Sequence, residues 1–320
     1  MNDVAVFGTG AWGTALAIQA HRAGANVRLW ARTAERAAEI AAKQESPRLP
    51  GVRLPEAIVV TADPSGPAGV AVLAVPTQHL RSLVETLPRE VPPAVVCAKG
   101  VETATHFLPL EVLESVRPGA AAGILSGPNF AHEIAAGLPA ASVLATTDPV
   151  LRETLMASLR TPAFRIYGSD DPIGVQVGGA AKNVIAIAAG AVIGAGLGEN
   201  ARAALIARGL AELARLSVAL GGRSETVTGL SGLGDLLLTC TGRASRNYTL
   251  GLALGRGEKL ADILAARTAV TEGVTTAPAL VARAGGLDIP VCRAVAALLE
   301  GRTTLRQAMS DLLARPPRDE

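Results

Sequence analysis

Cysteine is scarce in this chain of 320 residues, which has only Cys97, Cys240 and Cys292. The three are far apart and stand in apolar surroundings, so neither a disulfide framework nor a zinc site can be assembled from them. The net charge is only +2, and the basic residues are scattered, which argues against a nucleic-acid or anionic-membrane surface. Met1 is followed at once by a polar pair and a short apolar run, which leaves no room for a signal peptide. We therefore expect a cytoplasmic protein with reduced thiols and no metal.

One apolar stretch, residues 184–197, resembles a membrane helix in composition. It is shorter than the roughly 20 residues that span a bilayer. It also contains glycines and is flanked by Lys182 and Glu199. These features favour a buried helix in a globular core, so we expect no insertion into a membrane.

The chain begins with an apolar strand, a glycine turn and an alanine-rich helix, over residues 4–22. The turn has G-x-G-x-x-G spacing through Gly8, Gly10 and Gly13. In such a fingerprint the first glycine permits the turn, the second lets backbone approach a pyrophosphate, and the third lets the helix pack on the strand. The phosphates then lie on the amides at the helix N-terminus. The spacing alone is weak evidence, but its place between a strand and a helix predicts a dinucleotide site.

Strand and helix patterns alternate through the first half of the chain, as in a doubly wound parallel sheet. After the first strand, further strands are predicted at 26–30, 58–60, 70–75, 95–98, 123–125, 141–145 and 164–167, with a helix at 34–43 capped by Thr33. From residue 173 the pattern is helical, at 182–194, 201–220, 260–266, 276–284 and 289–300. The predicted fold class is α/β, with a nucleotide-binding Rossmann domain at 1–178 and an all-α substrate-binding domain at 179–320.

The residues after the second strand bear on the choice between NAD and NADP. A site specific for NAD places Asp or Glu there to bind the ribose 2′-hydroxyl, whereas this chain has Trp30, Ala31 and Arg32. The Arg32 guanidinium can bind a 2′-phosphate, although an ordinary exposed loop arginine fits the position as well. We predict that NADPH is favoured and NAD is tolerated.

Lysine is rare, since the chain has 26 arginines and only four lysines. Lys99 follows a predicted buried strand, at the carboxyl end where open α/β sheets bind ligands. Lys182 lies in an apolar stretch, where an unpaired ammonium is costly to bury. An ammonium can transfer a proton, which a guanidinium cannot do. We interpret both lysines as site residues and Lys182 as catalytic; the alternative is a structural lysine that pairs with a carboxylate or extends to solvent.

Two further stretches of the second half carry polar groups that fit a ligand site. Asp235 is the only charged residue of the glycine- and leucine-rich stretch 229–240, so its carboxylate needs a cationic or hydroxyl partner. A hydroxyl, a guanidinium and an amide follow, which together can bind a phosphate: Ser245, Arg246 and Asn247. Either stretch is also compatible with a helix terminus and its cap.

Eight ordered motifs resemble those of the bacterial NAD(P)-dependent glycerol-3-phosphate dehydrogenases over essentially the whole chain. The motifs are Gly8-Thr9-Gly10-Ala11-Trp12-Gly13-Thr14, Val75-Pro76, Lys99-Gly100, Ser126-Gly127-Pro128-Asn129-Phe130-Ala131, Lys182-Asn183, Gly232-Leu233-Gly234-Asp235, Ser245-Arg246-Asn247 and Val270-Thr271-Glu272-Gly273. The resemblance implies that reduced nicotinamide delivers hydride to dihydroxyacetone phosphate, giving sn-glycerol 3-phosphate for glycerophospholipid synthesis. It also implies a homodimer.

The resemblance implies roles for individual residues. With the fingerprint glycines, the cofactor-binding positions are Gly8, Gly10, Trp12, Gly13, Arg32, Lys99, Ala131, Arg246, Val270 and Glu272. The substrate-binding positions are Lys99, Gly127, Asn129, Lys182, Asp235, Ser245, Arg246 and Asn247, with Lys182 as general acid in reduction and general base in oxidation. One departure is Asn129, where the family usually has serine. Both side chains can donate and accept a hydrogen bond, so we expect a change in contact geometry more than in reaction type.

Two other functions remain compatible with part of the pattern. A dehydrogenase of 3-hydroxy acids would share the Rossmann half and the Lys182-Asn183 pair, but it would not need the phosphate donors at 245–247. A nucleotide-sensing protein could keep the fold without turnover, although the two lysines argue against that alternative.

Overall fold

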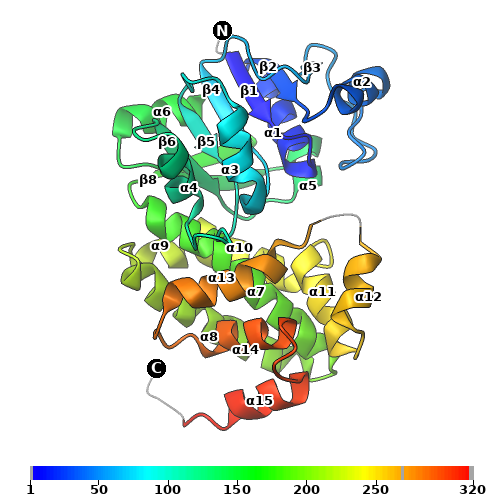
Figure 1. Ribbon diagram of the computed structural model, residues 1–320, viewed down its shortest axis with the longest axis vertical. Helices are drawn as coiled ribbons and strands as arrows, with labels where there is room; N and C mark the ends of the chain where they lie inside the picture. The colour runs from blue at the N-terminus through cyan, green and yellow to red at the C-terminus, as the bar shows by residue number, and fades with distance from the viewer. Residues whose placement is uncertain (1–2, 268–269, 317–320) are drawn as a thin grey trace. The chain divides into compact units, whose positions relative to one another are not determined.

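The protein is described here by a computed structural model, which covers residues 3–267 and 270–316 (Figure 1). Met1 and Asn2, which entered the argument against a signal peptide, lie outside the described residues. The chain forms two compact units. Unit 1 contains Met1–Lys99 and Phe107–Gln176, and unit 2 contains Gly100–His106 and Val177–Glu320.

Unit 1 is built on an eight-stranded sheet with the order β3-β2-β1-β4-β5-β6-β7-β8. Its strands are β1 (Asp3–Phe7), β2 (Asn26–Trp30), β3 (Val59–Thr61), β4 (Val70–Leu73), β5 (Ala94–Val96), β6 (Ala122–Ser126), β7 (Ala140–Ala145) and β8 (Phe164–Ser169). The strand order reverses at β1, which pairs in parallel with both β2 and β4. Ligands of open α/β sheets bind outside the carboxyl ends of the strands at such a reversal. The predicted doubly wound fold class is confirmed.

One pairing departs from the parallel sheet that the sequence predicts, because β7 runs antiparallel to β6. The connection between these strands contains only α5 (Ala131–Ala136), a helix of six residues. Such a helix spans about 9 Å, whereas a five-residue strand spans about 17 Å. With its flanking loops the connection has 13 residues, about the minimum for a parallel crossover, and here the chain turns back beside β6 instead.

Helices cover both faces of this sheet. On one face lie α1 (Ala11–Arg22), α2 (Ala34–Lys43), α5 and α6 (Pro149–Ala157), and on the other lie α3 (Thr77–Thr86) and α4 (Pro109–Val116). Successive side chains along a strand point alternately into the two cores. In β1, Val4 and Val6 pack with the first group and Ala5 and Phe7 with the second. The central strands β1 and β4 are thus buried on both faces, as strands in the middle of a parallel sheet with helices on both sides must be.

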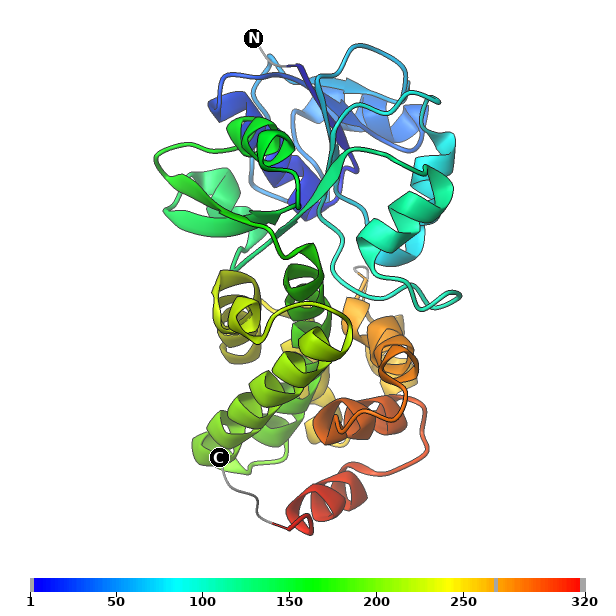
Figure 2. The same cartoon turned by 90° about the vertical axis from the view of Figure 1, so that its left-hand side faces the viewer.

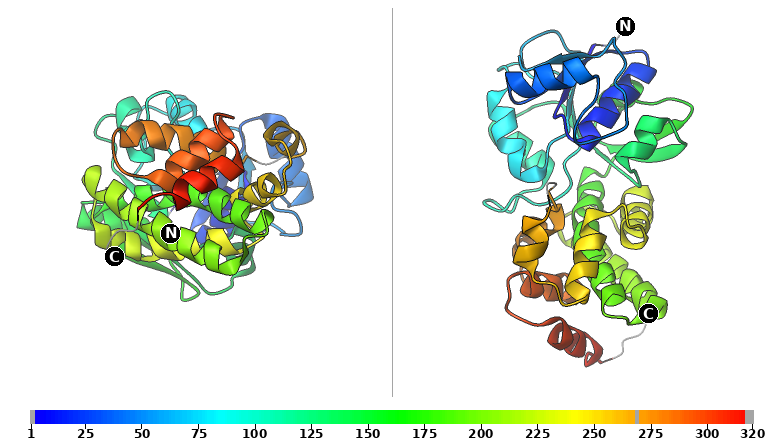
Figure 3. Two further views of the ribbon diagram at one scale, coloured as in Figure 1. Left: turned by 90° about the horizontal axis from the view of Figure 1, so that it is seen from below. Right: turned by 90° about the vertical axis from the view of Figure 1, so that its right-hand side faces the viewer.

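Unit 2 is helical, and Figures 2 and 3 show its helices from several sides. Its elements are the greater part of α7 (Pro172–Gly194), then α8 (Gly198–Ala219), α9 (Ser224–Thr228), the π-helical turn η1 (Leu230–Gly234), α10 (Asp235–Thr241), α11 (Arg246–Gly255), α12 (Leu260–Ala265), α13 (Glu272–Ala284), α14 (Pro290–Leu299) and α15 (Leu305–Leu313). The all-α character predicted for the second half is confirmed.

The apolar helix α7 is longer than the sequence predicts. It has 23 residues, so by length and composition it could cross a membrane, which corrects the argument from a short apolar stretch. Most of its apolar stretch is buried inside the protein. Gly209 of α8 packs directly on Ile185 of α7, which shows how closely its neighbours approach it. Helix α7 is thus the core helix of unit 2.

Candidate active site

The glycine turn of unit 1 has the geometry that a dinucleotide needs. Gly8 has a φ of +121°, and a Cβ there would lie 2.6 Å from the backbone oxygen of Ala74. A Cβ on Gly13 would lie 2.0 Å from the backbone oxygen of Gly8, so only glycine lets α1 pack this closely. A Cβ on Gly10 would meet no atom within 4 Å. The protein thus leaves open space beside the Gly10 backbone, where a pyrophosphate fits.

The amides that begin α1 are free of a side-chain cap, since its N-cap residue is Gly10. Four amides of a helix N-terminus lack partners within the helix and can bind an anion. The turn is held from outside by Ser46, whose hydroxyl donates to the backbone oxygen of Thr9 at 2.8 Å. Nothing in the sequence distinguishes Ser46, because a serine in a proline-rich loop carries no particular signal.

The residues predicted to select the cofactor lie at the end of β2. The Trp30 indole donates to the backbone oxygen of Ala62 at 3.0 Å, and its ring lies 5.8 Å from that of Phe7. Arg32 follows in an exposed position. Its guanidinium is therefore accessible at the carboxyl end of β2, where the ribose of a dinucleotide is bound in this fold.

Three predicted residues come together beyond β5 and β6. Lys99 donates from Nζ to the backbone oxygen of Gly127 at 3.1 Å. Gly127 has a φ of +150°, and a Cβ there would lie 2.9 Å from Cα of Ser142. Asn129 donates from Nδ2 to Oγ of Ser142 at 2.7 Å. Oδ1 of Asn129 is buried and has no hydrogen-bond partner within the described part of the chain, so this oxygen can accept a hydrogen bond from a ligand.

Two predicted cofactor residues lie near this cluster: Ala131 follows Asn129 closely in the sequence, and Trp12 lies near the same thiol as Lys99. Ala131 is the first residue of α5 and packs partly buried against the core. Trp12 lies near the thiol of Cys97, as does Lys99. Both lower the pKa of Cys97, but burial outweighs them and raises that pKa to about 12. Cys97 is therefore a neutral thiol beneath the site.

In unit 2, Lys182 forms a direct ion pair with Oδ1 of Asp235. Lys182 lies on α7 and is 8% exposed, whereas Asp235 begins α10 and is 0% exposed. Thr239 follows one turn later and donates from its hydroxyl to the backbone oxygen of Asp235 at 2.5 Å. A buried pair keeps the ammonium charged and fixes its direction. The ion pair with Asp235 is compatible with a structural role of Lys182 as well as with a catalytic one.

The donors predicted to bind phosphate surround the start of α11. Ser245 is the N-cap residue and accepts at Oγ from the amide of Tyr248 at 3.2 Å. Arg246 is exposed and donates from Nη1 to the backbone oxygen of Val270 at 2.8 Å. Asn247 is buried, and its Oδ1 accepts from the amide of Gly273 at 3.0 Å. The predicted phosphate and cofactor segments are therefore in direct contact, with Glu272 at the first position of α13.

Two residues outside the predicted set belong to this cluster. Asn183, next to Lys182, accepts at Oδ1 from Nδ2 of Asn247 at 2.8 Å. Arg267 donates to the backbone oxygen of Arg246 at 2.7 Å and to Oγ1 of Thr249 at 3.2 Å. Burial and the positive charge of Arg246 both lower the pKa of Arg267. The Lys182-Asn183 motif could have drawn attention to Asn183, whereas nothing in the sequence distinguishes Arg267 from the other arginines.

The predicted site residues thus form two clusters. Unit 1 holds the glycine turn with Trp12, Arg32, Lys99, Gly127, Asn129 and Ala131, and unit 2 holds Lys182, Asp235, Ser245, Arg246, Asn247, Val270 and Glu272. Among the residues that the structure describes, no group of three histidine, cysteine, aspartate or glutamate side chains is placed to hold a metal ion.

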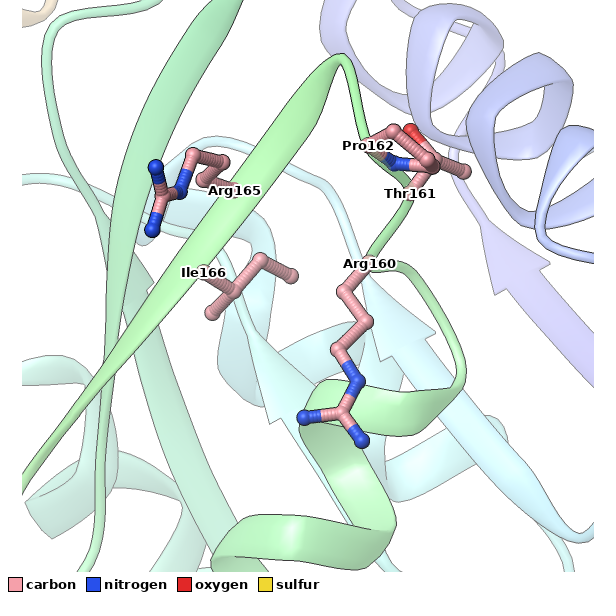
Figure 4. Close-up of a pocket in the computed structure, with 5 residues that line it drawn as sticks. All are labelled: Arg160, Thr161, Pro162, Arg165 and Ile166. Atoms are coloured by element: carbon pink, nitrogen blue, oxygen red, sulfur yellow. The ribbon is translucent and has the colours of Figure 1, made fainter.

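A surface pocket of unit 1 shares no residue with these clusters (Figure 4). It is lined by Arg160, Thr161, Pro162, Arg165 and Ile166, none of which is a predicted site residue. Its two arginines have partners within the protein. Arg160 lies 3.4 Å from a carboxylate oxygen of Glu153, and the guanidinium of Arg165 lies 5.5 Å from the ring centre of Tyr167.

Family models match both halves of the chain. The model described as the N-terminus of NAD-dependent glycerol-3-phosphate dehydrogenase matches residues 3–151, and the model described as its C-terminus matches residues 171–310.

Individual proteins match the chain over nearly its full length. A glycerol-3-phosphate dehydrogenase [NAD(P)+] of Acidiphilium cryptum is 57% identical, over 99% of this chain and 98% of the relative. The protein of the same name from Gluconobacter oxydans is 51% identical over the same shares. Among solved structures, glycerol-3-phosphate dehydrogenase of Coxiella burnetii is 35% identical and superposes with a TM-score of 0.92, covering 98% of this chain and 99% of that one.

Proposed function

Because this chain belongs to the NAD-dependent glycerol-3-phosphate dehydrogenase family, we propose that it reduces dihydroxyacetone phosphate to sn-glycerol 3-phosphate with NADPH or NADH, and catalyses the reverse reaction. The observation that carries this proposal is the buried pair of Lys182 and Asp235, held in the same cluster as Ser245, Arg246 and Asn247. One proton donor and one set of phosphate donors are what a phosphorylated ketone requires.

The residues of unit 1 fit the nicotinamide dinucleotide. The amides at the start of α1 would bind its pyrophosphate above Gly10, where the protein leaves space. Arg32 would bind the 2′-phosphate of NADPH, while NADH, which lacks that group, would still be accepted. The other positions proposed to contact the cofactor are Trp12, Lys99, Ala131, Arg246, Val270 and Glu272. The bound nicotinamide supplies or accepts the hydride.

Lys182 moves the proton that balances this hydride. Reduction of a ketone to an alcohol consumes one hydride at carbon and one proton at oxygen. The charged ammonium of Lys182 donates its proton to the carbonyl oxygen as negative charge develops there. Asp235 holds the ammonium in position and favours its charged form. In the oxidation, the neutral amine accepts the proton from the hydroxyl of sn-glycerol 3-phosphate.

The remaining predicted residues orient the substrate. Ser245, Arg246 and Asn247 would bind its phosphate, since a guanidinium and neutral donors suit a dianionic group. Lys99, Gly127 and Asn129 are also proposed to contact the substrate. The unpaired Oδ1 of Asn129 can accept a hydrogen bond from a substrate hydroxyl, which a serine in its place would do from a shorter side chain.

We also propose the setting in which the enzyme works. Residues 1–178 would act as the nucleotide-binding domain and residues 179–320 as the substrate-binding domain. The protein would be a cytoplasmic homodimer, without insertion into a membrane or binding to nucleic acid. Its product would supply glycerophospholipid synthesis.

The decisive experiment follows the absorbance of reduced nicotinamide when dihydroxyacetone phosphate is added, with NADPH and NADH in parallel. Lys182→Ala should lower kcat by roughly 10²- to 10⁴-fold, the usual contribution of a general acid. Lys259→Ala is the matched control, because Lys259 is an exposed lysine of the same unit. A Lys182→Ala protein that binds NADPH and keeps its rate would refute the role of Lys182.

The same assay separates the other two functions. A dehydrogenase of 3-hydroxy acids would oxidise carboxylate substrates and ignore sn-glycerol 3-phosphate. A nucleotide-sensing protein would bind NADPH tightly without oxidising it in the presence of any ketone. Turnover of dihydroxyacetone phosphate with the expected product refutes both.

A further inference from the structure

Helices α7 and α11 are in backbone contact along four glycines, which we call the glycine seam: Gly190 and Gly194 on α7, and Gly251 and Gly255 on α11. On α11, a Cβ at Gly251 would lie 1.9 Å from the backbone oxygen of Ile187. On α7, a Cβ at Gly190 would lie 2.0 Å from the backbone oxygen of Tyr248.

The outer half of the glycine seam is as close. A Cβ on Gly194 would lie 2.2 Å from the backbone oxygen of Leu252, and one on Gly255 would lie 2.3 Å from that of Ala191. In each helix the two glycines are four residues apart and therefore lie on one face. Since backbone atoms meet backbone atoms, no side-chain rotation can absorb a change in the spacing of the helices.

One end of the glycine seam lies at the candidate site. Asn247 precedes Gly251 by one turn of α11, and Asn183 precedes Ile187 by one turn of α7. The two asparagine side chains are hydrogen-bonded at 2.8 Å. Gly273 closes the junction, since a Cβ there would lie 2.7 Å from Oδ1 of Asn247 and 2.8 Å from the backbone oxygen of Asn183.

This end of the seam also has a free donor. Asn183 is 4% exposed, and its Nδ2 has no hydrogen-bond partner within residues 3–267 and 270–316. A buried amide donor without a protein partner is costly unless a ligand or water completes it. The seam therefore ends beside a position where a ligand oxygen is needed, between the neighbours of Lys182 and of Arg246.

We propose that the glycine seam fixes the separation between the proton donor Lys182 and the phosphate donors Ser245, Arg246 and Asn247, and thereby selects ketones by the number of bonds between carbonyl and phosphate. The inference rests on the proposed function. Lys182 belongs to α7 and the phosphate donors to the start of α11, so the spacing of these two helices is the spacing of the two ends of the substrate.

A rigid spacing matters because hydride transfer needs the carbonyl carbon and oxygen in place at the same time as the phosphate. Misplacement of reacting groups by about 1 Å costs on the order of 100-fold in rate. A ketone phosphate with one more carbon between carbonyl and phosphate cannot satisfy Lys182 and the phosphate donors together. A ketone without phosphate does not contact the phosphate donors, so its reduction does not depend on the spacing of the two helices.

The test compares Gly251→Ala, at the site end of the seam, with Gly255→Ala, one turn farther away. Gly286→Ala serves as a control for the change of residue type, because a Cβ there meets no atom within 4 Å. For each protein, kcat/KM is measured with dihydroxyacetone phosphate and with dihydroxyacetone, which lacks the phosphate. The folded fraction is followed by circular dichroism during heating.

Gly251→Ala should lower kcat/KM for dihydroxyacetone phosphate by on the order of 100-fold, and that for dihydroxyacetone by no more than about threefold. Gly255→Ala should destabilise the protein but keep the ratio of the two values near that of the unchanged enzyme. Equal losses on both substrates in Gly251→Ala would overturn the proposal, since they would show a purely structural role.

A measurement on the unchanged enzyme keeps the proposal testable if Gly251→Ala does not fold. A hydroxyketone phosphate with one additional carbon between carbonyl and phosphate should have a kcat/KM on the order of 100-fold below that of dihydroxyacetone phosphate. Comparable values would overturn the proposal. If the unchanged enzyme reduces neither ketone phosphate, the proposed function itself fails, and that outcome is distinct from a failure of the seam.

Discussion

At the scale of the residue, Arg32 should decide between the two nicotinamide cofactors. Its exposed guanidinium follows β2, and a hydrogen bond to a charged group contributes about 1.5–3 kcal/mol. Arg32→Gln should therefore lower kcat/KM for NADPH by roughly 10- to 100-fold and leave that for NADH nearly unchanged.

The matched control for Arg32 is Arg36→Gln, one turn into α2, which removes only an exposed contact with Glu39 at 2.6 Å. Initial rates with both cofactors, for both variants, check the prediction. An equal loss with NADPH and NADH in Arg32→Gln would mean that the arginine shapes the loop rather than recognises the 2′-phosphate.

The sequence indicates the catalytic pair because the chemistry of its two residues conflicts with their surroundings. Lys182 and Asp235 are charges in apolar stretches, and the structure pairs them with each other. Arg267 could not have been found in this way, because its contacts with Arg246 and Thr249 depend on the packing of the chain around α11.

At the scale of the element, two glycines of the glycine turn have different roles. Gly10 leaves space for the cofactor, whereas Gly13 lets α1 pack on the strand. Gly10→Ala should leave the unfolding temperature almost unchanged, because a Cβ there meets no protein atom within 4 Å, yet it should weaken NADPH binding by filling the space for the pyrophosphate. Gly13→Ala should cost about 1–3 kcal/mol of stability, the usual cost of overpacking, since its Cβ would lie 2.0 Å from a backbone oxygen.

Titration of NADPH into each glycine variant and thermal unfolding without ligand test this contrast. Unchanged affinity in Gly10→Ala would show that the pyrophosphate lies elsewhere. Unchanged stability in Gly13→Ala would show that α1 can move away from the strand without cost.

Helix α14 has an unusual cap that should give the protein a pH-dependent stability. Glu212 of α8 is 1% exposed, and its two carboxylate oxygens accept from the amides of Val291 and Cys292 at 2.6 and 3.0 Å. Burial raises the pKa of Glu212 above its ordinary value of 4.5, although the two amides oppose this effect. The folded protein therefore holds the proton to a higher pH than the unfolded chain.

The sign of the effect follows from proton binding. Between pH 4.5 and the higher pKa of Glu212 in the folded protein, the folded state binds more protons, so the free energy of unfolding falls as pH rises. Glu212→Gln removes this dependence, so the stability advantage of the unchanged protein over the variant should shrink as pH rises from 4.5.

Urea unfolding of both proteins over a pH series measures this difference. Glu114→Gln provides a comparison, because Glu114 is an exposed carboxylate that accepts from the amide of Gly119 at 3.1 Å. An advantage of the unchanged protein that grows with pH would mean that the amides outweigh burial at Glu212.

A helix with regular hydrophobic periodicity can be predicted from the sequence, whereas the glycine-rich start of α7 cannot. Helix α2 was predicted at 34–43 with Thr33 as its cap, and the structure has both as predicted. Helix α7 was predicted to begin at 182, yet it begins at Pro172 and runs through Gly178 and Gly179. Glycine normally disfavours a helix. Here a Cβ on Gly178 would lie 2.6 Å from the backbone oxygen of Ser231, so tertiary contact requires the residue that local propensity rejects.

At the scale of the whole molecule, the thiols of the three cysteines should be unreactive in the folded protein. Cys97, Cys240 and Cys292 are free and buried, and burial raises the pKa of Cys97 and of Cys240 to about 12. The thiolate is the reactive form. Alkylation near pH 8 should therefore be slow in the native protein and fast in denaturant, and added reductant should leave the unfolding temperature unchanged.

Mass spectrometry after timed alkylation counts the modified thiols. A control in guanidinium chloride should show all three cysteines modified. Fast modification of one cysteine in the native protein would show that its surroundings open, and an unfolding temperature lowered by reductant would show a disulfide.

The division of the chain into a sheet-based half and a helical half is predictable from the change of pattern near residue 173. The membership of Gly100–His106 in unit 2 is not, since these seven residues come shortly after β5, and the chain returns to unit 1 at Phe107. No periodicity marks such a short excursion. It arises from contacts between residues far apart in the sequence, which a local pattern does not contain.

Helix α7 has a consequence for the order in which the protein is made. Its backbone and side chains are covered by α8 at Gly209, by α11 at Gly251 and by α13 at Gly273, all of which lie later in the chain. A ribosome therefore releases the most apolar helix of the protein well before its cover exists. The growing chain therefore passes through a stage in which the apolar surface of α7 is still uncovered, and unit 2 can complete its core only after α13 has emerged.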